Sequence, residues 1–573
     1  MKYRIICIVV VCLFMYSVNI VYAAPVPDTG QILQEQKQIE INKIKKLPIQ
    51  DKQKPQEKNQ DNSLTITIKE FQFQDIGNIA TEFELQEILK PAIGRIVSFT
   101  DLQELVDSIT KYLRDKGFFL ARAYVPKQDI TNGVITISII AGLAEDVPIV
   151  RLSKPHRIKK DVLEKLAQAG VDPKQALNKN KLERSLLLMN DMPGISAKST
   201  IEKGIEPGTT RVFIDAREGP LLNTALSVDN FGNRYTGIVQ TTIQTALNNP
   251  NGQGDQLGLA HTQATGLLKE KIYYVSPIGD SGLKGGITYT FLSYELQKDL
   301  ESLDADGTAH AMNVSFNYPY ARSRGFSVWH NLNYEYRHLT DRVSNTKTRL
   351  RDLHVFNTGI SLNGYDKLNG GGITNFNTSA TVGILDLGVA VDAVSDASTA
   401  RTEGGFVKYS YSFSRLQRVI DNWSIFGSLS GQFANQNLDT SEKIILGGPS
   451  GVRAYPVGEA SGDEGHIFSK ELRYDHPRKI SGHNVQLLGF FDTGYMVSHN
   501  DSWNNAISSA TGNNKYWISG FGAGINISRQ DIYTLHFTYS NTIGNNPGRT
   551  TTEKDADNKN NDNRFWAQFI LWF

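Results

Sequence analysis

The chain has 573 residues, enough for two or more domains, and its formal net charge is +1 at pH 7. This balance argues against nucleic acid as the main partner, because proteins that track phosphates normally carry a clear basic excess. The only two cysteines, Cys7 and Cys12, lie within the first 23 residues, so the rest of the chain has no thiol, disulfide or cysteine metal ligand.

Residues 1–23 are predicted to be a secretory signal peptide. Lys2 and Arg4 precede an apolar run from Ile5 to Tyr16, and Val21-Tyr22-Ala23 fits a small-residue cleavage site. The alternative is an uncleaved anchor, but the run is shorter than the ~20 apolar residues that a spanning helix needs. We therefore expect the chain to be exported.

Residues 24–46 are predicted to hold one polar helix, and residues 47–63 a linker. The segment from Asp28 to Lys46 has helix-forming composition with few aliphatic residues, so this helix is too polar for a protein core. The next segment is dominated by Gln, Lys, Asp and Pro, a composition that cannot bury enough surface to fold.

Residues 64–143 and 144–218 are predicted to be two α+β modules of one kind. In the first, a strand from Leu64 to Phe73 precedes a helix that opens with a capping-box pattern at Thr100 and stops at Gly117. Two strands follow, and the recurrence of this element order indicates an internal repeat. The strands of the first module are 120–125 and 134–140, and the elements of the second are 149–152, 160–169, 181–190, 196–203 and 210–217.

Residues 219–573 are predicted to form an all-β membrane barrel. Short alternating segments, such as 222–228 and 328–336, are separated by turn residues or polar loops of uneven length. The loops at 498–514 and 545–562 are long, whereas the turn around Pro319 looks short. Long loops on one rim and short turns on the other are typical of outer-membrane barrels, and about 355 residues at roughly 20 to 22 per strand give about 16 strands.

The end of the chain has the pattern of a final outer-membrane strand. Phe565, Phe569 and Leu571 alternate on one face, and the chain ends in Phe573. About ten residues is the length that a tilted strand needs to cross a bilayer. We interpret these four residues as a terminal assembly signal and their face as a contact with outer-membrane lipid; the alternative is an ordinary buried edge strand.

Three features of the sequence are candidates for catalytic or ligand sites. Gly279-Asp280-Ser281-Gly282 matches the nucleophile signature of trypsin-like proteases, but it follows Pro277 in a strand-rich region and fits a turn better. The eleven histidines show no metal-binding spacing. The segment Gly520 to Gly524 lacks the helix of a phosphate-binding turn, so its small residues are expected to leave room inside the barrel. We predict no enzyme, no metal and no cofactor.

A glycine-rich loop from Gly447 to Gly465 surrounds Val452, Arg453, Ala454 and Tyr455. Its partner is predicted on the strand 484–497, where Phe490, Asp492 and Gly494 share one face. The other face suits lipid, so Asp492 is expected to point into the lumen beside Gly494, where a missing side chain leaves space. A loop folded into the lumen can bring its guanidinium to this carboxylate.

These motifs resemble those of the outer-membrane transporters of two-partner secretion, which belong to the barrel-assembly superfamily. Val452 to Tyr455 resembles the VRGY loop signature, and Phe490 to Gly494 the FxDxG strand signature. Ala454 stands where the family has glycine, which argues against a positive φ at this position. Further matches are Gln31-Ile32-Leu33, Leu188 to Gly194, Asp229 to Gly232 and Glu471 to Tyr474.

The resemblance implies two POTRA domains, a 16-stranded barrel, a first helix that plugs the pore, and an arginine loop that reaches the aspartate. It implies an outer-membrane pore, with its POTRA domains in the periplasm, that recognises and secretes a large, unfolded, β-rich exoprotein and is itself inserted by the barrel-assembly machinery. The alternatives are an assembly factor of the same superfamily, which the count of two repeats disfavours, and a passive porin. The cargo, whether haemolysin, adhesin or haem-binding protein, and its activation stay open.

Overall fold

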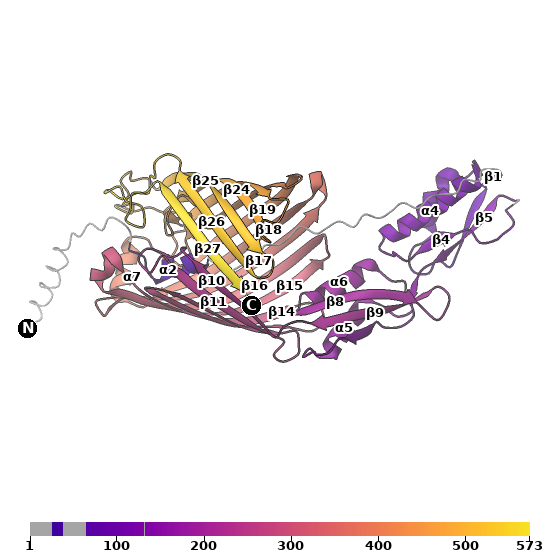
Figure 1. The fold of residues 1–573 in the computed structure, drawn as a ribbon, viewed down its shortest axis with the longest axis horizontal. Coiled ribbons are helices and arrows are strands. Elements are labelled where there is room, and N and C mark those ends of the chain that lie inside the picture. Colours follow the sequence, from indigo (N-terminus) through magenta and orange to yellow (C-terminus); the bar gives the residue numbers. More distant parts are fainter. Residues whose placement is uncertain (1–25, 38–64, 131) are drawn as a thin grey trace, which may run out of the picture.

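The computed structural model describes residues 26–37, 65–130 and 132–573 (Figure 1). The signal peptide predicted at 1–23, the linker at 47–63 and the second half of the predicted polar helix lie outside the described residues. Of the helices within the described ranges, none is long and apolar enough to span a membrane.

The first α+β unit packs two helices against small sheets. Ser98 caps the longer helix and forms a capping box with Asp101, so this helix begins slightly earlier than the pattern at Thr100 predicts. Gly117, with φ +99°, follows its end as expected. The elements are β1 (Thr65–Thr67), β2 (Glu70–Gln74), α3 (Glu82–Leu89), η1 (Lys90–Ala92), β3 (Ile96–Ser98), α4 (Phe99–Asp115), β4 (Arg122–Tyr124) and β5 (Val134–Ile140).

The second α+β unit has its own core and a mixed sheet. Its last strand pairs in parallel with two short strands and antiparallel with β8 over nine residue pairs. Leu163, Leu182 and Ile214 are buried between the helices and this sheet. The elements are β6 (Leu143–Ala144), β7 (Ile149–Leu152), α5 (Lys160–Gly170), α6 (Lys179–Asn190), β8 (Ile195–Lys203) and β9 (Thr209–Glu218).

Residues from 222 onward form a closed barrel of sixteen antiparallel strands, which confirms the predicted architecture. The last strand pairs with the first and closes the ring. The strands are β10 (Leu222–Asp229), β11 (Gln240–Asn248), β12 (Gln256–Ala264), β13 (Leu267–Pro277), β14 (Lys284–Glu295), β15 (Ala305–Arg322), β16 (Phe326–Val343), β17 (Thr346–Asp366), β18 (Gly372–Leu387), β19 (Gly404–Ile420), β20 (Trp423–Ala434), β23 (Glu464–Asp475), β24 (Asn484–Val497), β25 (Lys515–Arg529), β26 (Tyr533–Thr542) and β27 (Asn563–Trp572).

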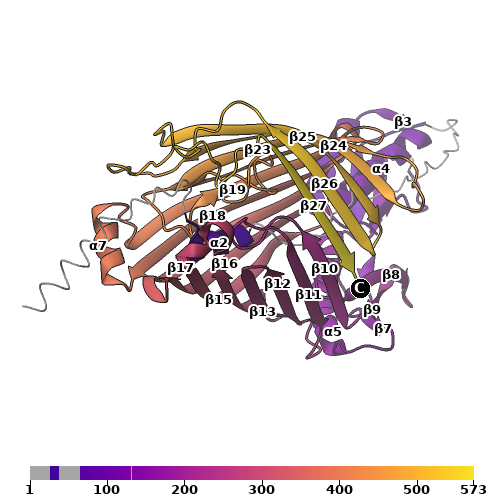
Figure 2. The ribbon, with the colours of Figure 1, turned by 60° about the vertical axis from the view of Figure 1, so that its left-hand side comes forward.

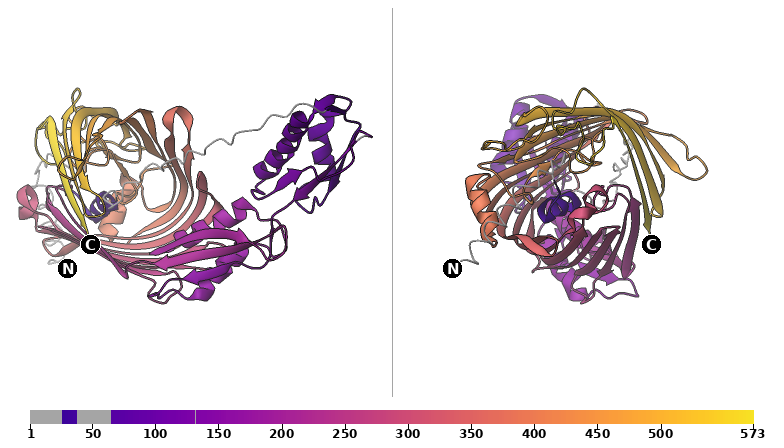
Figure 3. Two further views of the ribbon diagram at one scale, coloured as in Figure 1. Left: turned by 45° about the vertical axis from the view of Figure 1, so that its right-hand side comes forward. Right: turned by 90° about the vertical axis from the view of Figure 1, so that its left-hand side faces the viewer.

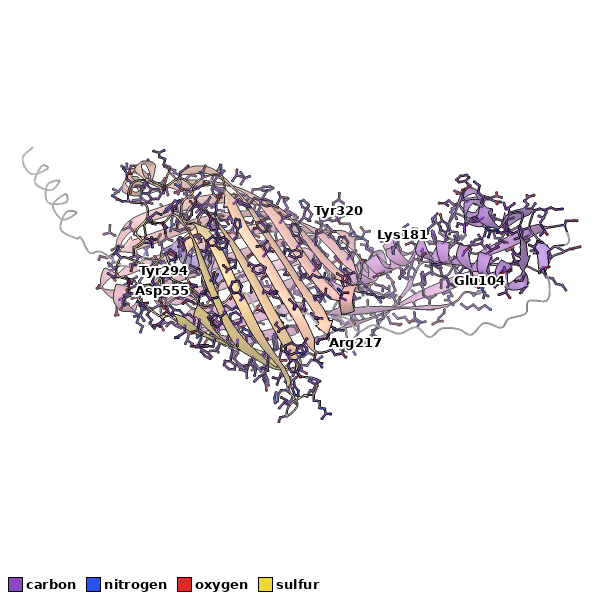
Figure 4. The ribbon with its side chains drawn as sticks, turned by 90° about the horizontal axis from the view of Figure 1, so that it is seen from above. Glu104, Lys181, Arg217, Tyr294, Tyr320 and Asp555 are labelled. Carbon is purple, nitrogen blue, oxygen red and sulfur yellow. The ribbon has the colours of Figure 1, made fainter. Side chains whose placement is uncertain are left out.

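The two rims of the barrel differ in loop length. Short connections such as 323–325 and 530–532 lie at the rim beside the second unit, and long loops lie at the opposite rim. Figure 4 shows this polarity, with Tyr320 at the end near the α+β units and Asp555 toward the far end. The far rim carries η2 (Lys298–Leu303) and α7 (Ala390–Ser398), and the near rim carries η3 (Leu368–Gly370).

Two local predictions are changed or refined by the strand bounds. Pro319 does not mark a turn, because β15 continues to Arg322 through a register shift between Pro319 and Ala321. A bulge accommodates a residue that cannot donate a ladder hydrogen bond, which explains why the strand survives the proline. The Gly279 to Gly282 segment does form the turn between β13 and β14.

The helix α2 (Thr29–Lys37) lies inside the ring of strands, in the half nearer the long loops (Figures 2 and 3). It contacts β14, β15 and β16. The prediction of a helix too polar for a core was incomplete, because Ile32 and Leu33 are buried in an apolar cluster with the barrel-wall residues Leu292 and Leu339. The lumen therefore holds a small hydrophobic core of its own around this helix.

Candidate functional site in the barrel lumen

The loop between β20 and β23, residues 435–463, folds back into the barrel. A short hairpin of β21 (Ile444–Ile445) and β22 (Ser461–Gly462) starts and ends the folded part. Val452, Ala454 and Tyr455 are buried in an apolar cluster with Met496 and Ile518 of the wall. The glycine-rich sequence therefore forms a packed insertion into the lumen rather than an exposed loop.

The structure brings Arg453 and Asp492 together in a bidentate ion pair. The Nε atom of Arg453 donates to Oδ2 of Asp492 at 2.8 Å, and its Nη2 atom donates to Oδ1 at 2.8 Å. The guanidinium carbon lies 3.5 Å from the centre of the Phe490 ring. Asp492 is 0% and Arg453 7% exposed, so both charges are removed from solvent and depend on each other.

A second carboxylate, which sequence reasoning missed, completes the arginine's surroundings. The Nη1 atom of Arg453 donates to Glu471 at 2.7 Å, and Nη2 also contacts the Ser469 hydroxyl. Ser469 in turn donates to Asp492 at 2.7 Å. The family match at Glu471 to Tyr474 already pointed to this strand. Side chains alternate along β23, so Ser469 and Glu471 both lie on its lumen face. We call Arg453, Ser469, Glu471 and Asp492 the Arg453 clamp.

The backbone of the loop tip is held by the last two strands. The carbonyl oxygen of Arg453 accepts hydrogen bonds from the Ser540 hydroxyl at 2.8 Å and from Trp566 Nε1 at 2.7 Å. These donors lie on β26 and β27, whereas the acidic partners lie on β23 and β24. One residue of the loop therefore bridges four strands next to the seam at which the barrel closes.

Small residues on the wall make room for the loop. A Cβ atom added to Gly520 would lie 2.3 Å from the Cβ atom of Ala454, and one on Gly494 would lie 3.0 Å from Leu446. Ala454 itself does not have a positive φ, whereas Ala460 later in the loop does, with φ 54°. Alanine is therefore compatible with the observed backbone at position 454.

The N-terminal end of α2 is held by a buried cluster of charges. Asp28 caps the helix by accepting from the Gln31 backbone N–H at 2.9 Å, and it also accepts from Arg351 at 3.2 Å. Arg351 further donates to Asp341 at 2.6 Å and to Asp439 at 2.9 Å. Asp341 lies on the wall and Asp439 on the inserted loop, so this Arg351 cluster joins helix, wall and loop.

The rest of α2 uses weaker contacts. Glu35 accepts from the Asn233 amide at 3.1 Å, Lys37 lies 3.3 Å from Glu335, and Lys269 donates to the carbonyl oxygen of Gln36 at 3.1 Å. Glu335 and Lys269 lie on the wall strands β16 and β13, and Asn233 lies in the loop between β10 and β11. The helix is therefore anchored along its length, and both of its charged residues take part.

The predicted terminal assembly signal lies on the closing strand. Phe565 and Phe573 are exposed, and Phe569 and Leu571 are half-buried beside the first strand. β27 pairs with β10 over five residue pairs, fewer than the nine it makes with β26. Beyond this ladder the backbone N–H of Phe573 donates to the carbonyl of Thr224 at 2.9 Å, so the terminal residue extends the seam.

The second α+β unit is fixed to the near rim by polar contacts. Asp191, just after α6, forms a bidentate pair with Arg322, with both distances 2.8 Å. Glu218, the last residue of β9, accepts from the backbone N–H of Ile158 in the same unit at 2.9 Å and from the amide of Asn249, in the connection between β11 and β12, at 2.9 Å. Burial alone would raise the pKa of Glu218, but the backbone donors of Ile158 and Arg157 hold it below the usual value.

The comparisons with known proteins agree with this architecture. The family model for the haemolysin secretion/activation protein ShlB/FhaC/HecB matches residues 208–526, and the ShlB-type POTRA domain model matches residues 66–142. The heme/hemopexin transporter protein HuxB of Haemophilus influenzae is 27% identical over 556 residues, covering 96% of this chain and 95% of HuxB. The outer membrane transporter CdiB of Dickeya dadantii is 24% identical, covering 73% of this chain and 74% of its own.

Solved structures show the same fold. CdiB from Escherichia coli has a TM-score of 0.73 and 18% identity, covering 91% of this chain and 93% of its own. A BamA structure from Haemophilus ducreyi has a TM-score of 0.51 and 14% identity, covering 89% of this chain and 100% of its own. Given the family match over more than half of its length, the chain belongs to the haemolysin secretion/activation protein family, and it is an outer-membrane transporter of two-partner secretion with a periplasmic N-terminal region.

Proposed function

We propose that the chain exports one large, β-rich exoprotein through its barrel, and that α2 and the inserted loop together hold the resting, closed state. The observation that carries this proposal is the Arg351 cluster, in which Asp28 of the helix, Asp439 of the loop and Asp341 of the wall share one guanidinium. A helix tied in this way to the element that fills the lumen acts as a plug. Its displacement is the first step of opening.

Both α+β units, at 64–143 and 144–218, act as POTRA domains in this proposal. Unfolded cargo docks on an exposed strand edge by β-augmentation, which uses backbone hydrogen bonds and therefore suits extended, β-prone clients. In the first unit β2 is such an edge, because within the described part of the chain it pairs on one side only, with β5. The second unit, fixed to the rim through Asp191 and Arg322, delivers the segment to the mouth of the barrel.

The role proposed for the Arg453 clamp is to keep the loop tip in its transport-competent position against the closing strands. Phe565, Phe569, Leu571 and Phe573 serve as the signal that the barrel-assembly machinery reads when it inserts this chain, and the outer face of β27 contacts lipid. Among cargo classes, the HuxB match over nearly the whole chain favours a haem- or hemopexin-binding exoprotein.

The test is a secretion assay in a double-membraned host that expresses the chain together with a large, β-rich candidate exoprotein. Intact cells should release the exoprotein only when the transporter is present. The abundance of other outer-membrane barrels should stay constant when the chain is deleted. Loss of several unrelated barrels, with exoprotein release unaffected, would instead identify an assembly factor of the same superfamily.

A further inference from the structure

One side of the barrel lumen is lined by uncharged amide and hydroxyl side chains. It comprises the inward-facing positions of six consecutive strands, at 313–317, 331–333, 357–363, 375–381, 410–414 and 428–430. Every such position holds Asn, Ser or Thr, apart from Gly359. The outward positions between them hold exposed apolar side chains such as Phe356 and Val382. We call this surface the neutral band.

Strand register makes the neutral band continuous. Asn317 is opposite Asn331, Asn377 is opposite Ser412, and Ser412 is opposite Ser430. Neighbouring side chains bond to one another, as when the Asn377 amide donates to the Ser412 hydroxyl at 3.1 Å. An amide has two donors and an acceptor with two lone pairs, so these contacts leave capacity for a ligand.

Two cavities lie along the neutral band. One, of about 460 Å³, is lined by Asn331, Ser361 and Asn377, with Lys284 of the barrel and Asp191 of the second α+β unit at its mouth. The other, of about 590 Å³, is lined by Asn357 and other band residues, and it reaches Leu33 and Lys37 of α2. The band therefore faces open space from the periplasmic mouth to the helix.

The ends of the neutral band meet the parts of the protein that handle cargo. At the mouth, Lys284, which is opposite Asn317, donates to the Asp191 backbone carbonyl at 2.6 Å, directly beside the attachment of the second α+β unit. On the far strand, Ser428 is opposite Ser469, a member of the Arg453 clamp. The neutral band therefore joins the attachment of the second unit to the clamp.

Charge is present beyond the neutral band but not within it. Near the plug, Glu335, Arg337 and Lys408 occupy the next inward positions on their strands. A fixed charge in the lumen that touches an opposite charge on the cargo makes that contact last roughly fivefold longer, even in water. An unfolded chain would then be retained at each of its charged residues. Conduction instead needs many contacts that are each weak.

We propose that the neutral band is the track on which the backbone of an extended, unfolded polypeptide slides, through exchangeable hydrogen bonds that ignore the sequence and charge of the cargo. The inference rests on the proposed secretion function and adds the path and the kind of recognition. Amide and hydroxyl groups both donate and accept, so they replace water on peptide N–H and C=O groups at any register. The ligand class is an extended peptide, not a specific sequence.

The test uses disulfide capture on the full chain in lipid nanodiscs, because the mature chain has no cysteine of its own. Asn377→Cys and Ser412→Cys place thiols in the band. Gln244→Cys is the matched control, since Gln244 also faces the lumen, opposite the buried Ala225, but lies outside the band. The probes are three synthetic 20-residue Gly/Ser/Thr peptides with one activated disulfide each, carrying no charge, four lysines or four glutamates.

Capture at positions 377 and 412 should be several-fold faster than at 244, with the three peptides differing by no more than about twofold. Adding Ser361→Asp to Asn377→Cys should speed capture of the lysine peptide roughly fivefold and slow that of the glutamate peptide. Equal rates at band and control positions, or a strong charge preference in the unaltered band, would overturn the proposal. This assay needs no cargo, so a failed secretion assay in cells would count against the proposed function alone.

Discussion

Replacing Arg453 should release the inserted loop, and the structure predicts how much each partner matters. In Arg453→Ala the buried Asp492 loses its countercharge and keeps two neutral donors, the Ser469 hydroxyl and the backbone N–H of residue 453, whereas Glu471 still pairs with Arg473 at 2.6 Å. In Asp492→Ala the guanidinium keeps Glu471 at 2.7 Å and its place over Phe490. The arginine variant should therefore be the more severe of the two.

The expected magnitudes differ enough to measure. Removing one partner of a buried ion pair costs about 3 to 5 kcal/mol when the other charge is left uncompensated. Losing a hydrogen bond to a charged group while compensation remains costs about 1.5 to 3 kcal/mol. Since about 1.4 kcal/mol is a factor of ten, Arg453→Ala should raise the population with a released loop at least a hundredfold, and Asp492→Ala by less.

Trypsin cleavage after Lys443 reports loop release, because this residue lies in the same loop and pairs with Asp463 at 3.0 Å when the loop is seated. The appearance of the peptide ending at this lysine is followed in folded protein. Arg342→Ala is the control, since its pair with Asp306 is exposed and is worth about 0 to 1 kcal/mol. Unchanged cleavage in Arg453→Ala, or faster cleavage in Asp492→Ala, would refute this reasoning.

Four further outcomes are expected. Deleting residues 26–37 should raise conductance in planar bilayers while exoprotein release stays largely intact; unchanged conductance would place the plug elsewhere. Deleting Phe573 should slow barrel assembly, seen as loss of the heat-modifiable band on a gel, because the Thr224 carbonyl loses a donor. Residues 64–218 alone should be soluble and bind unfolded exoprotein weakly, since the client loses entropy on ordering, in a pull-down that folded exoprotein fails. Because folding lowers the pKa of Glu218, its hydrogen bonds stabilise the second α+β unit above the ordinary pKa of 4.5, and this stabilisation is lost as the pH falls through the lowered pKa. Amide exchange at Ile158 should therefore become faster in acid, and Glu218→Gln should remove this dependence on pH.

The barrel could be predicted from sequence because its period-2 pattern is local and repeated. The alternation ending at Phe573, the long polar loops and the count of strand-sized segments each report on a few neighbouring residues. The α+β units could be predicted for the same reason, because helix spacing and capping residues are also local patterns. Strand ends were harder to predict: β16 extends well past its predicted segment 328–336, because ladder pairing, not propensity, decides where it stops.

Only part of the candidate site could be predicted from the sequence. Alternation placed Asp492 on the lumen face, and the glycines pointed to a closely approaching loop, so this pair could be inferred. The motif match included Glu471, but its contact with Arg453 could not be inferred, because it depends on strand register and on where the loop inserts. The Arg351 cluster could not be inferred either, since it joins a wall strand to the helix N-terminus and to the loop. For the same reason the burial of Ile32 and Leu33 was missed, since their apolar partners come from the wall.

The two charge networks differ in what they leave behind when the inserted element departs. If α2 leaves, Arg351 keeps Asp341 and Asp439, and Glu335 keeps Arg337, so the wall charges that the helix uses stay compensated. If the loop tip leaves, Asp492 loses the guanidinium with which it pairs. Withdrawal of the helix therefore carries a smaller electrostatic penalty than withdrawal of the loop. This asymmetry supports the proposal that the helix is the part that exits during transport and that the Arg453 clamp holds the loop in position while it does.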